Sequence, residues 1–107
     1  DGVRYVVMES GGDAKQMMAM LGELTRDSST PTLAVLGSRD GGVTLLVAST
    51  EGSIAAERHN AVEILDAIAG HIGGGRGGGR PTFAQGGGSN PDGIPAALDA
   101  ARLLLGI

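Results

Sequence analysis

The residues best suited to hold a ligand lie in one glycine-rich stretch, GGGRGGGRPTFAQGGG, from Gly73 to Gly88. Glycine amides have no side chain in front of them, so a phosphate or a nucleoside can lie directly against the main chain. Arg76 and Arg80 add guanidinium groups, which bind phosphate through paired hydrogen bonds. The chain carries a formal net charge of -4, yet residues 67–91 contain no Asp or Glu. The stretch is therefore a basic strip on an acidic protein, and we expect its ligand to be anionic.

Two well-known phosphate-binding patterns do not fit this stretch. Gly73, Gly75 and Gly78 satisfy G-x-G-x-x-G, but that pattern binds a dinucleotide only where it leaves a strand and opens a helix. Here the glycines follow a predicted helix and lead into an Arg-Pro pair. A P-loop would require Gly-Lys, and the single lysine of the chain is Lys15. Two interpretations stay open: a backbone surface for phosphate or RNA, and a flexible linker.

Three side chains in the stretch could act on a ligand or on the protein itself. Arg80 precedes a proline, which holds it extended, and it could contact phosphate or pair with a carboxylate of the same molecule. Phe83 could stack on an exposed base, although a lone aromatic residue more often packs into the core. Gln85 could touch the ligand, but it more often satisfies amides of its own loop.

No combination of residues indicates a catalytic or metal centre. The chain has no cysteine, and its two histidines, His59 and His71, are not spaced as metal ligands. We expect both histidines at helix ends or on the surface. No G-x-S-x-G motif occurs, and the acidic residues are spread along the chain instead of paired in one segment. The sequence therefore predicts a domain without catalysis, metal or cofactor of its own.

The pattern of apolar residues predicts the elements that must position the stretch. Strands are expected at 3–8, 32–37 and 43–49, with a short extended piece at 82–85. Helices are expected at 13–25, from residue 61 to an end near 70–73, and at about 94–105. The first strand is almost wholly apolar, which is typical of a buried strand. Asp40-Gly41 predicts a hairpin turn, and Asn60 predicts a helix N-cap. We expect an α/β fold: one mixed β-sheet with an opening βαβ unit, about three helices, and the Gly-rich loop before the last helix.

Length and composition set further expectations. The 107 residues suit a single domain, 1–107, and the start at Asp1 instead of Met is typical of a piece of a larger protein. Without cysteine the fold depends on packing alone, and we expect a cytoplasmic protein. The sequence has no leader and no apolar run of membrane length, so no membrane association is expected. The negative net charge argues against a protein that coats nucleic acid without selectivity.

The stretch from Gly73 to Gly88 resembles the signature of the C-terminal, DHH-associated domain of alanyl-tRNA synthetases, where a glycine run, Arg-Pro and Ala-Gln-Gly-Gly follow in that order. The layout is also similar, with a GGDAK turn into the first helix and a VLGS strand end. The resemblance implies an accessory domain that binds the outer corner of tRNA(Ala) and helps couple aminoacylation with editing. The binding residues that it implies are Gly73, Gly74, Gly75, Arg76, Gly77, Gly78, Gly79, Arg80 and Gln85.

The resemblance also implies partners and leaves two alternatives. Other domains of the parent synthetase would use ATP, Mg and zinc, whereas this domain would hold no cofactor, and it could contribute to a homodimer. One alternative is the substrate-binding domain of a DHH-family phosphoesterase, whose version has a histidine just after the glycines where this chain has Arg80-Pro81. The other is a dimerisation module in which the stretch packs against another chain.

Overall fold

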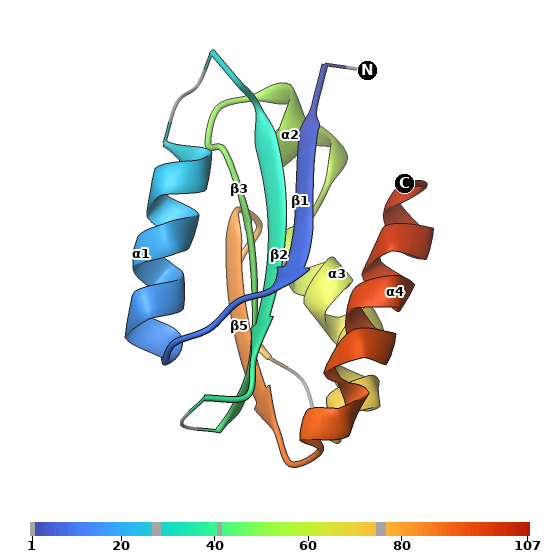
Figure 1. The fold of residues 1–107 in the computed structure, drawn as a ribbon. Helices are drawn as coiled ribbons and strands as arrows, with labels where there is room; N and C mark the ends of the chain where they lie inside the picture. Colours follow the sequence, from blue (N-terminus) through green and yellow to red (C-terminus); the bar gives the residue numbers. More distant parts are fainter. Residues whose placement is uncertain (1, 27–28, 41, 75–76) are drawn as a thin grey trace.

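The computed structural model describes residues 2–26, 29–40, 42–74 and 77–107, and Figure 1 shows the fold. Two predicted elements have the expected bounds, the strand at 43–49 and the helix at 94–105. The elements in chain order are β1 (Arg4–Glu9), α1 (Ala14–Thr25), β2 (Thr32–Ser38), β3 (Val43–Ser49), α2 (Ile54–Arg58), α3 (Ala61–Ile68), η1 (Ala69–Ile72), β4 (Gly78–Arg80), β5 (Phe83–Gly88), η2 (Pro91–Gly93) and α4 (Ile94–Leu105).

Within the described residues, five strands form one mixed sheet in the order β1-β2-β3-β5-β4. β1 and β2 pair in parallel, with Val6 opposite Ala34, and α1 connects them. The other neighbouring strands are antiparallel, including the hairpin of β2 and β3. The predicted mixed sheet with an opening βαβ unit is confirmed. Gly41 of the predicted hairpin turn lies outside the described residues.

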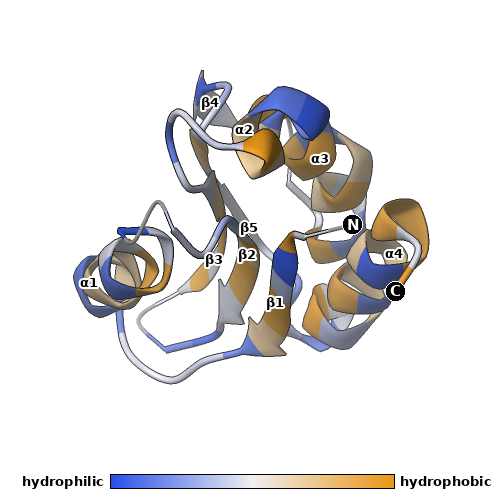
Figure 2. Cartoon of the chain, turned by 90° about the horizontal axis from the view of Figure 1, so that it is seen from above, coloured by the Kyte–Doolittle hydropathy of each residue, from blue (hydrophilic) through white to orange (hydrophobic). Residues whose placement is uncertain are grey.

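Helices cover both faces of the sheet, as Figure 2 shows from above. Side chains alternate along a strand, so a strand between two helical layers is buried on both sides, and every residue of β2 is buried. On one face α1 packs over a core of Met17, Leu21, Ala34, Leu36, Leu46 and Ala48. On the other face α3 and α4 cover a larger core that includes Leu33, Val35, Val47, Leu65 and Leu98.

Polar residues begin the helices by satisfying the free amides of the first turn. Asp13 and Gln16 form a capping box on α1, in which the Asp13 side chain accepts from Gln16 N and Gln16 Oε1 accepts from Asp13 N, each at 2.9 Å. The Asn60 side chain accepts from the amides of Val62 and Glu63 at 3.0 and 3.2 Å, as predicted for an N-cap. These caps fix the residues at which α1 and α3 begin.

β1 is a half-exposed edge strand, and the prediction of a buried strand was wrong. The strand is apolar because it lies between both helical layers: Val6 packs against the core under α1, and Val7 packs against the core under α4. Its outer edge has no neighbouring strand in the described sheet. Instead, Nη2 of Arg102 in α4 donates a hydrogen bond to the Val7 carbonyl oxygen at 2.9 Å. An apolar strand can therefore lie at an edge that a helix side chain protects.

Sequence patterns did not predict three parts of the fold. α2 lies in the polar stretch at 51–59, where Ser53 caps a helix of only five residues. β4 was not predicted, and β5 continues to Gly88, beyond the short piece expected at 82–85. Glycine has a low preference for strands, so the glycines of β5 are held in the sheet by pairing with β3, and those of β4 by pairing with β5, and not by local propensity.

Candidate nucleic-acid interface

Most of the described part of the glycine-rich stretch forms a β-hairpin. β4 pairs antiparallel with β5, with Gly78 opposite Gln85 and Arg80 opposite Phe83. β5 also pairs with β3 along its whole length. We call residues 77–88 the glycine hairpin. Because its strands extend the central sheet, it is an ordered part of the domain and not a flexible spacer.

The turn of the glycine hairpin is fastened to two other elements. The amide of Ala61, at the start of α3, donates to the Pro81 carbonyl oxygen at 2.8 Å. The amide of Ser49, at the end of β3, donates to the Thr82 carbonyl oxygen at 3.0 Å. These two bonds fix the turn, and with it the position of the neighbouring Arg80.

Several glycines of the hairpin are required by packing inside the domain. A Cβ at Gly77 would overlap the side chain of Leu65 in α3 and would lie 2.7 Å from the Gln85 carbonyl oxygen. A Cβ at Gly88 would overlap the carbonyl oxygen of Ile72 in η1. Without side chains, β4 and β5 can lie directly on the helices. Part of the glycine content therefore serves the fold.

Gly73 and Gly74, also predicted to bind a ligand, end the preceding helical segment. Gly73 adopts a left-handed conformation with φ of 70° after η1, which glycine reaches without steric cost. The amide of Gly74 donates to the Ala69 carbonyl oxygen at 3.0 Å. Gly75 and Arg76, the next two predicted site residues, lie outside the described residues.

One face of the glycine hairpin is open. Residues opposite each other in an antiparallel pair share a face, so Gly78, Arg80, Phe83 and Gln85 all face the side of the sheet that α1 partly covers. Gly78, Arg80 and Gln85 are exposed. Apart from Gly78 and its two chain neighbours, no atom of the described residues lies within 4 Å of the position that a Cβ at Gly78 would take. The structure thus brings three of the predicted site residues together on one exposed surface.

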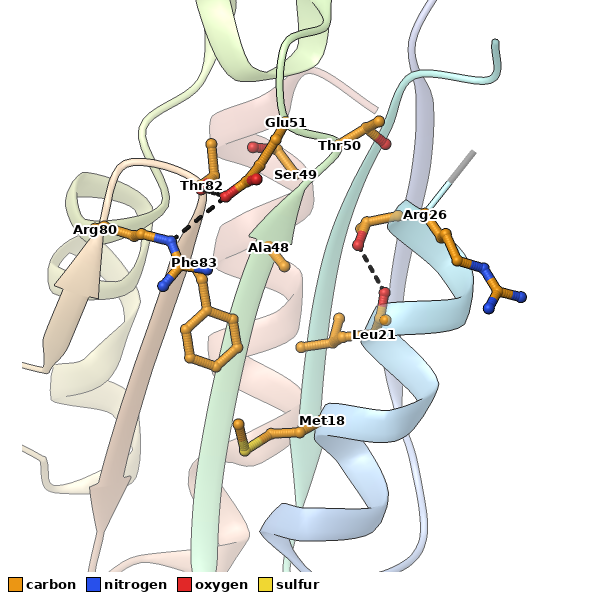
Figure 3. Close-up of a pocket in the computed structure, with 12 residues that line it drawn as sticks. Met18, Leu21, Arg26, Ala48, Ser49, Thr50, Glu51, Arg80, Thr82 and Phe83 are labelled. Atoms are coloured by element: carbon orange, nitrogen blue, oxygen red, sulfur yellow. Dashed lines mark hydrogen bonds and ion pairs between the residues drawn. The ribbon is translucent and has the colours of Figure 1, made fainter. Parts of the chain in front are cut away.

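On the same face, a cleft of about 530 Å³ lies between α1 and the start of β5 (Figure 3). We call it the α1–β5 cleft. Figure 3 shows Met18 and Leu21 on the α1 side, the Phe83 ring projecting from β5, and Arg80 and Glu51 at one end. Its full lining is Met18, Leu21, Gly22, Thr25, Arg26, Ala48, Ser49, Thr50, Glu51, Arg80, Thr82 and Phe83. Sequence patterns did not predict this cleft because its walls come from three segments far apart in the chain.

Opposite charges meet at the end of the cleft. Nε of Arg80 lies 3.5 Å from Oε1 of Glu51, and both side chains are 68% exposed. The guanidinium carbon of Arg80 lies 6.0 Å from the centre of the Phe83 ring, at the outer limit of a cation–π contact. Arg26 pairs with Glu23 at 2.8 Å, and its guanidinium points away from the cleft. Among the described residues that line the cleft, Arg80 and Glu51 are therefore the charged groups that face its interior.

The histidines lie at helix ends and away from this face. His59 follows α2, and its Nε2 lies 2.9 Å from the Tyr5 hydroxyl. Burial and, to a lesser degree, the charge of Arg58 lower the pKa of His59. His71 is exposed in the last turn of η1. Among the residues with described positions, no three His, Cys, Asp or Glu side chains are grouped to hold a metal ion.

The described helices are also too short or too polar to cross a membrane.

Phe83 is half-buried and packs against the core under α1, as the lone aromatic residue of the stretch was expected to do. The Gln85 side chain makes no hydrogen bond within the part of the chain that the structure describes. Gln85 is exposed on the open face of the glycine hairpin.

Comparisons with known proteins agree with this fold. The model of the DHHA1 domain family matches residues 2–106. The alanine–tRNA ligase of Chloroflexus aurantiacus is 35% identical over 100 residues, covering 94% of this chain and 11% of the relative. That of Methanothrix thermoacetophila is 39% identical over 100 residues, with the same coverage. The chain spans about a tenth of the length of these relatives.

A solved structure leads to the same family. The C-Ala domain of Aquifex aeolicus alanyl-tRNA synthetase superposes with a TM-score of 0.68 at 27% identity, covering 96% of this chain and 89% of that domain. The resemblance of residues 73–88 to the DHH-associated domain of alanyl-tRNA synthetases is thereby confirmed. Sequence and fold agree over nearly the whole chain, which therefore belongs to the DHHA1 domain family, in the form found in alanyl-tRNA synthetases.

Proposed function

We propose that this chain is the C-terminal accessory domain of an alanine–tRNA ligase and that it binds the outer corner of tRNA(Ala). It catalyses no reaction by itself. Aminoacylation and editing belong to other domains of the parent protein, which use ATP, Mg and zinc, and the whole enzyme works in the cytoplasm. Similarity to alanine–tRNA ligases over 94% of the chain supports this assignment.

The exposed face of the glycine hairpin is the observation that carries the proposal. Bare main chain at Gly78 lies close in sequence to Arg80, whose side chain is 68% exposed. The pair between Arg80 and Glu51 is long and solvated, so it contributes little stability and can give way to an RNA phosphate. Folded RNA is recognised largely by shape and backbone contacts, which such a surface offers.

This proposal divides the nine predicted site residues into two groups. Gly78, Arg80 and Gln85 contact RNA from the open face, and Arg76 adds charge from the same segment of the sequence. The described glycines Gly73, Gly74, Gly77 and Gly79 shape and support the segment, and Gly75 lies outside the described residues. A domain of this kind acts by position: a weak contact far from the reacting end keeps the tRNA close to the catalytic and editing domains and raises its effective concentration there.

A tRNA titration with matched variants tests the proposal. Arg80→Ala should weaken binding of a tRNA(Ala) transcript roughly threefold to tenfold and lower the slope of log affinity against log salt by about one. Lys15→Ala removes the same charge from an exposed position in the first turn of α1 and is the control. If Arg80→Ala and Lys15→Ala reduce the affinity equally, the glycine hairpin is not the binding surface.

A dimer is the second candidate function, and exposed apolar residues at the end of the chain favour it. Leu103, Leu104 and Ile107 are 84%, 55% and 55% exposed. Contiguous apolar groups of this kind are typical of protein contacts. Sedimentation equilibrium of the chain and of a Leu103→Lys variant distinguishes the cases: a monomer at high concentration in both would exclude self-association through this surface.

A DHH-family phosphoesterase is a weaker alternative. Its domain resembles this one but carries a histidine where this chain has Arg80-Pro81. The relatives described above are alanine–tRNA ligases. An Asp-His-His motif upstream in the parent protein, together with hydrolysis of short oligonucleotides, would establish the phosphoesterase instead.

A further inference from the structure

The α1–β5 cleft has two chemically different parts. Apolar side chains lie on both of its walls, with Met18 and Leu21 on one side and Phe83 on the other. One end is polar and holds a carboxylate, Glu51, beside Arg80. Its volume of about 530 Å³ falls within the roughly 300–1,000 Å³ of small-molecule sites. A flat apolar group with polar atoms at one edge fits this arrangement.

We propose that the α1–β5 cleft accepts one unstacked guanine base of the bound RNA, an inference that rests on the proposed binding of tRNA by this domain. The base lies against Phe83, and its Watson–Crick edge faces Glu51. Single bases that leave a stack are read in proteins by this combination of an aromatic face and hydrogen bonds to the base edge.

The apolar walls supply the contact for the face of the base. Phe83 is held by its place in β5 and by the core under α1, so its ring is ordered before a ligand arrives. Met18 is 45% exposed, and its flexible thioether can adjust to a base entering from the solvent side. Stacking of this kind does not distinguish one base from another, because every base has an aromatic face.

Glu51 distinguishes guanine from the other bases. An ionised carboxylate only accepts hydrogen bonds. Guanine carries two adjacent donors on its Watson–Crick edge, N1–H and the N2 amino group, and both can bond to one carboxylate. Adenine and cytosine each place an acceptor next to their donor, and uracil places its single donor between two acceptors. A carboxylate at the end of the cleft therefore favours guanine.

The groups that Glu51 contacts in this structure leave its carboxylate able to bind guanine. Oε1 accepts from the Thr82 hydroxyl at 3.0 Å and lies 3.5 Å from Arg80 Nε. The bond from Thr82 orients the carboxylate and can persist, since an oxygen accepts more than one hydrogen bond. Arg80 is only loosely held, so it can move to the phosphate of the same nucleotide. Base and phosphate would then engage neighbouring side chains of one site.

NMR titration of the 107-residue chain with two RNA pentamers, UUGUU and UUAUU, tests this inference. The wild-type chain should bind UUGUU at least about fivefold more tightly than UUAUU, with the largest shifts at Phe83, Ala48 and Met18. Glu51→Gln should lose this preference, because glutamine places a donor against the guanine donors. Glu57→Gln, which changes an exposed carboxylate in α2 that does not line the cleft, is the control and should keep it.

A second variant separates stacking from edge recognition. Phe83→Leu keeps an apolar side chain in the core. It should weaken the binding of both pentamers about fivefold or more without changing the ratio of the two affinities. Equal binding of the two pentamers by the wild type, no binding of either, retained preference in Glu51→Gln, or shifts confined to residues outside the cleft would each overturn the inference.

The pentamer and tRNA experiments fail independently. If Arg80→Ala and Lys15→Ala affect tRNA equally while the guanine preference holds, the proposed hairpin surface is wrong and the cleft site stands. If the preference is absent while Arg80→Ala selectively weakens tRNA, the cleft site is wrong and the proposed function stands.

Discussion

Replacing Gly79 with alanine should destabilise the domain, whereas the same change at Gly78 should not. The two glycines are neighbours in β4, and both are exposed. A Cβ at Gly79 would overlap the carbonyl oxygen of Phe83 and lie 2.6 Å from Cα of Ala84, and φ at Gly79 is +154°. At Gly78 a Cβ would have no neighbour within 4 Å in the described part of the chain beyond the adjoining residues of β4. The pair therefore separates a glycine required by packing from one that is not.

The magnitude follows from what the added methyl group meets. At Gly79 the obstacle is backbone of the adjoining strand, which cannot rotate away as a side chain can. Overpacking of this kind costs about 1–3 kcal/mol, and the unfavourable φ adds roughly 1 kcal/mol. β4 has only three residues at the sheet edge and can shift outward, so we expect a net loss of about 2 kcal/mol. At Gly78, alanine should leave stability unchanged or raise it by up to about 1 kcal/mol.

Urea unfolding followed by circular dichroism measures both variants. A loss of about 2 kcal/mol lowers the Tm of a domain of this size by about 8 °C or more, so thermal melts provide a second readout. Equal stability of the two variants, or a larger loss for Gly78→Ala, would refute the close approach of β4 to β5. Gly78→Ala also tests RNA binding. If bare main chain at Gly78 contacts the RNA, this variant should bind tRNA more weakly than the wild type although its stability is unchanged.

Three further predictions concern the rest of the fold. Met17→Ala, at a fully buried position in α1, should cost about 2–5 kcal/mol in urea unfolding, whereas Met20→Ala, at a position 38% exposed, should cost less than about 1 kcal/mol. Burial lowers the pKa of His59 below its ordinary value near 6.5, so the folded state favours the neutral ring. The contribution of the neutral His59 ring to the free energy of unfolding should be fully present above that pH and should be lost as the pH drops below it. In a pH series of unfolding curves, the free energy of unfolding should therefore fall less at low pH for His59→Gln than for the wild type. Arg102→Met removes the hydrogen bond to the Val7 carbonyl oxygen at the edge of β1, so it should lower the free energy of unfolding by about 1 kcal/mol. Because the edge strand then has a free carbonyl group, self-association measured by sedimentation velocity should increase.

The elements that were predicted correctly are those whose signals are local. The strand at 43–49 is a short apolar run, the helix at 94–105 has a clear apolar period, and the Asn60 cap lies next to the helix that it begins. The order of the glycines and the Arg-Pro pair is enough to indicate the family from the residues alone. Such features depend on residues a few positions apart, so a single sequence contains them.

The incorrect or missing elements depend on distant parts of the chain. β1 looked buried because it is apolar on both sides, yet its place at the edge depends on the sheet order and on Arg102. β4 consists of two glycines and an arginine, and its strand conformation comes from pairing with β5. Local propensity cannot reveal a strand that its partner stabilises.

By itself, the sequence determined the fold class, most of the elements and a glycine-rich segment with two arginines as the candidate site. Only the tertiary structure decided which glycines are free to meet a ligand: Gly77 lies against Leu65, whereas Gly78 is open. It also formed the α1–β5 cleft, because α1, the end of β3 and the start of β5 meet only when the sheet is assembled. The physical reason is the same in each case: periodicity and capping act between near neighbours in the chain, whereas close packing and cleft shape arise between residues that folding brings together.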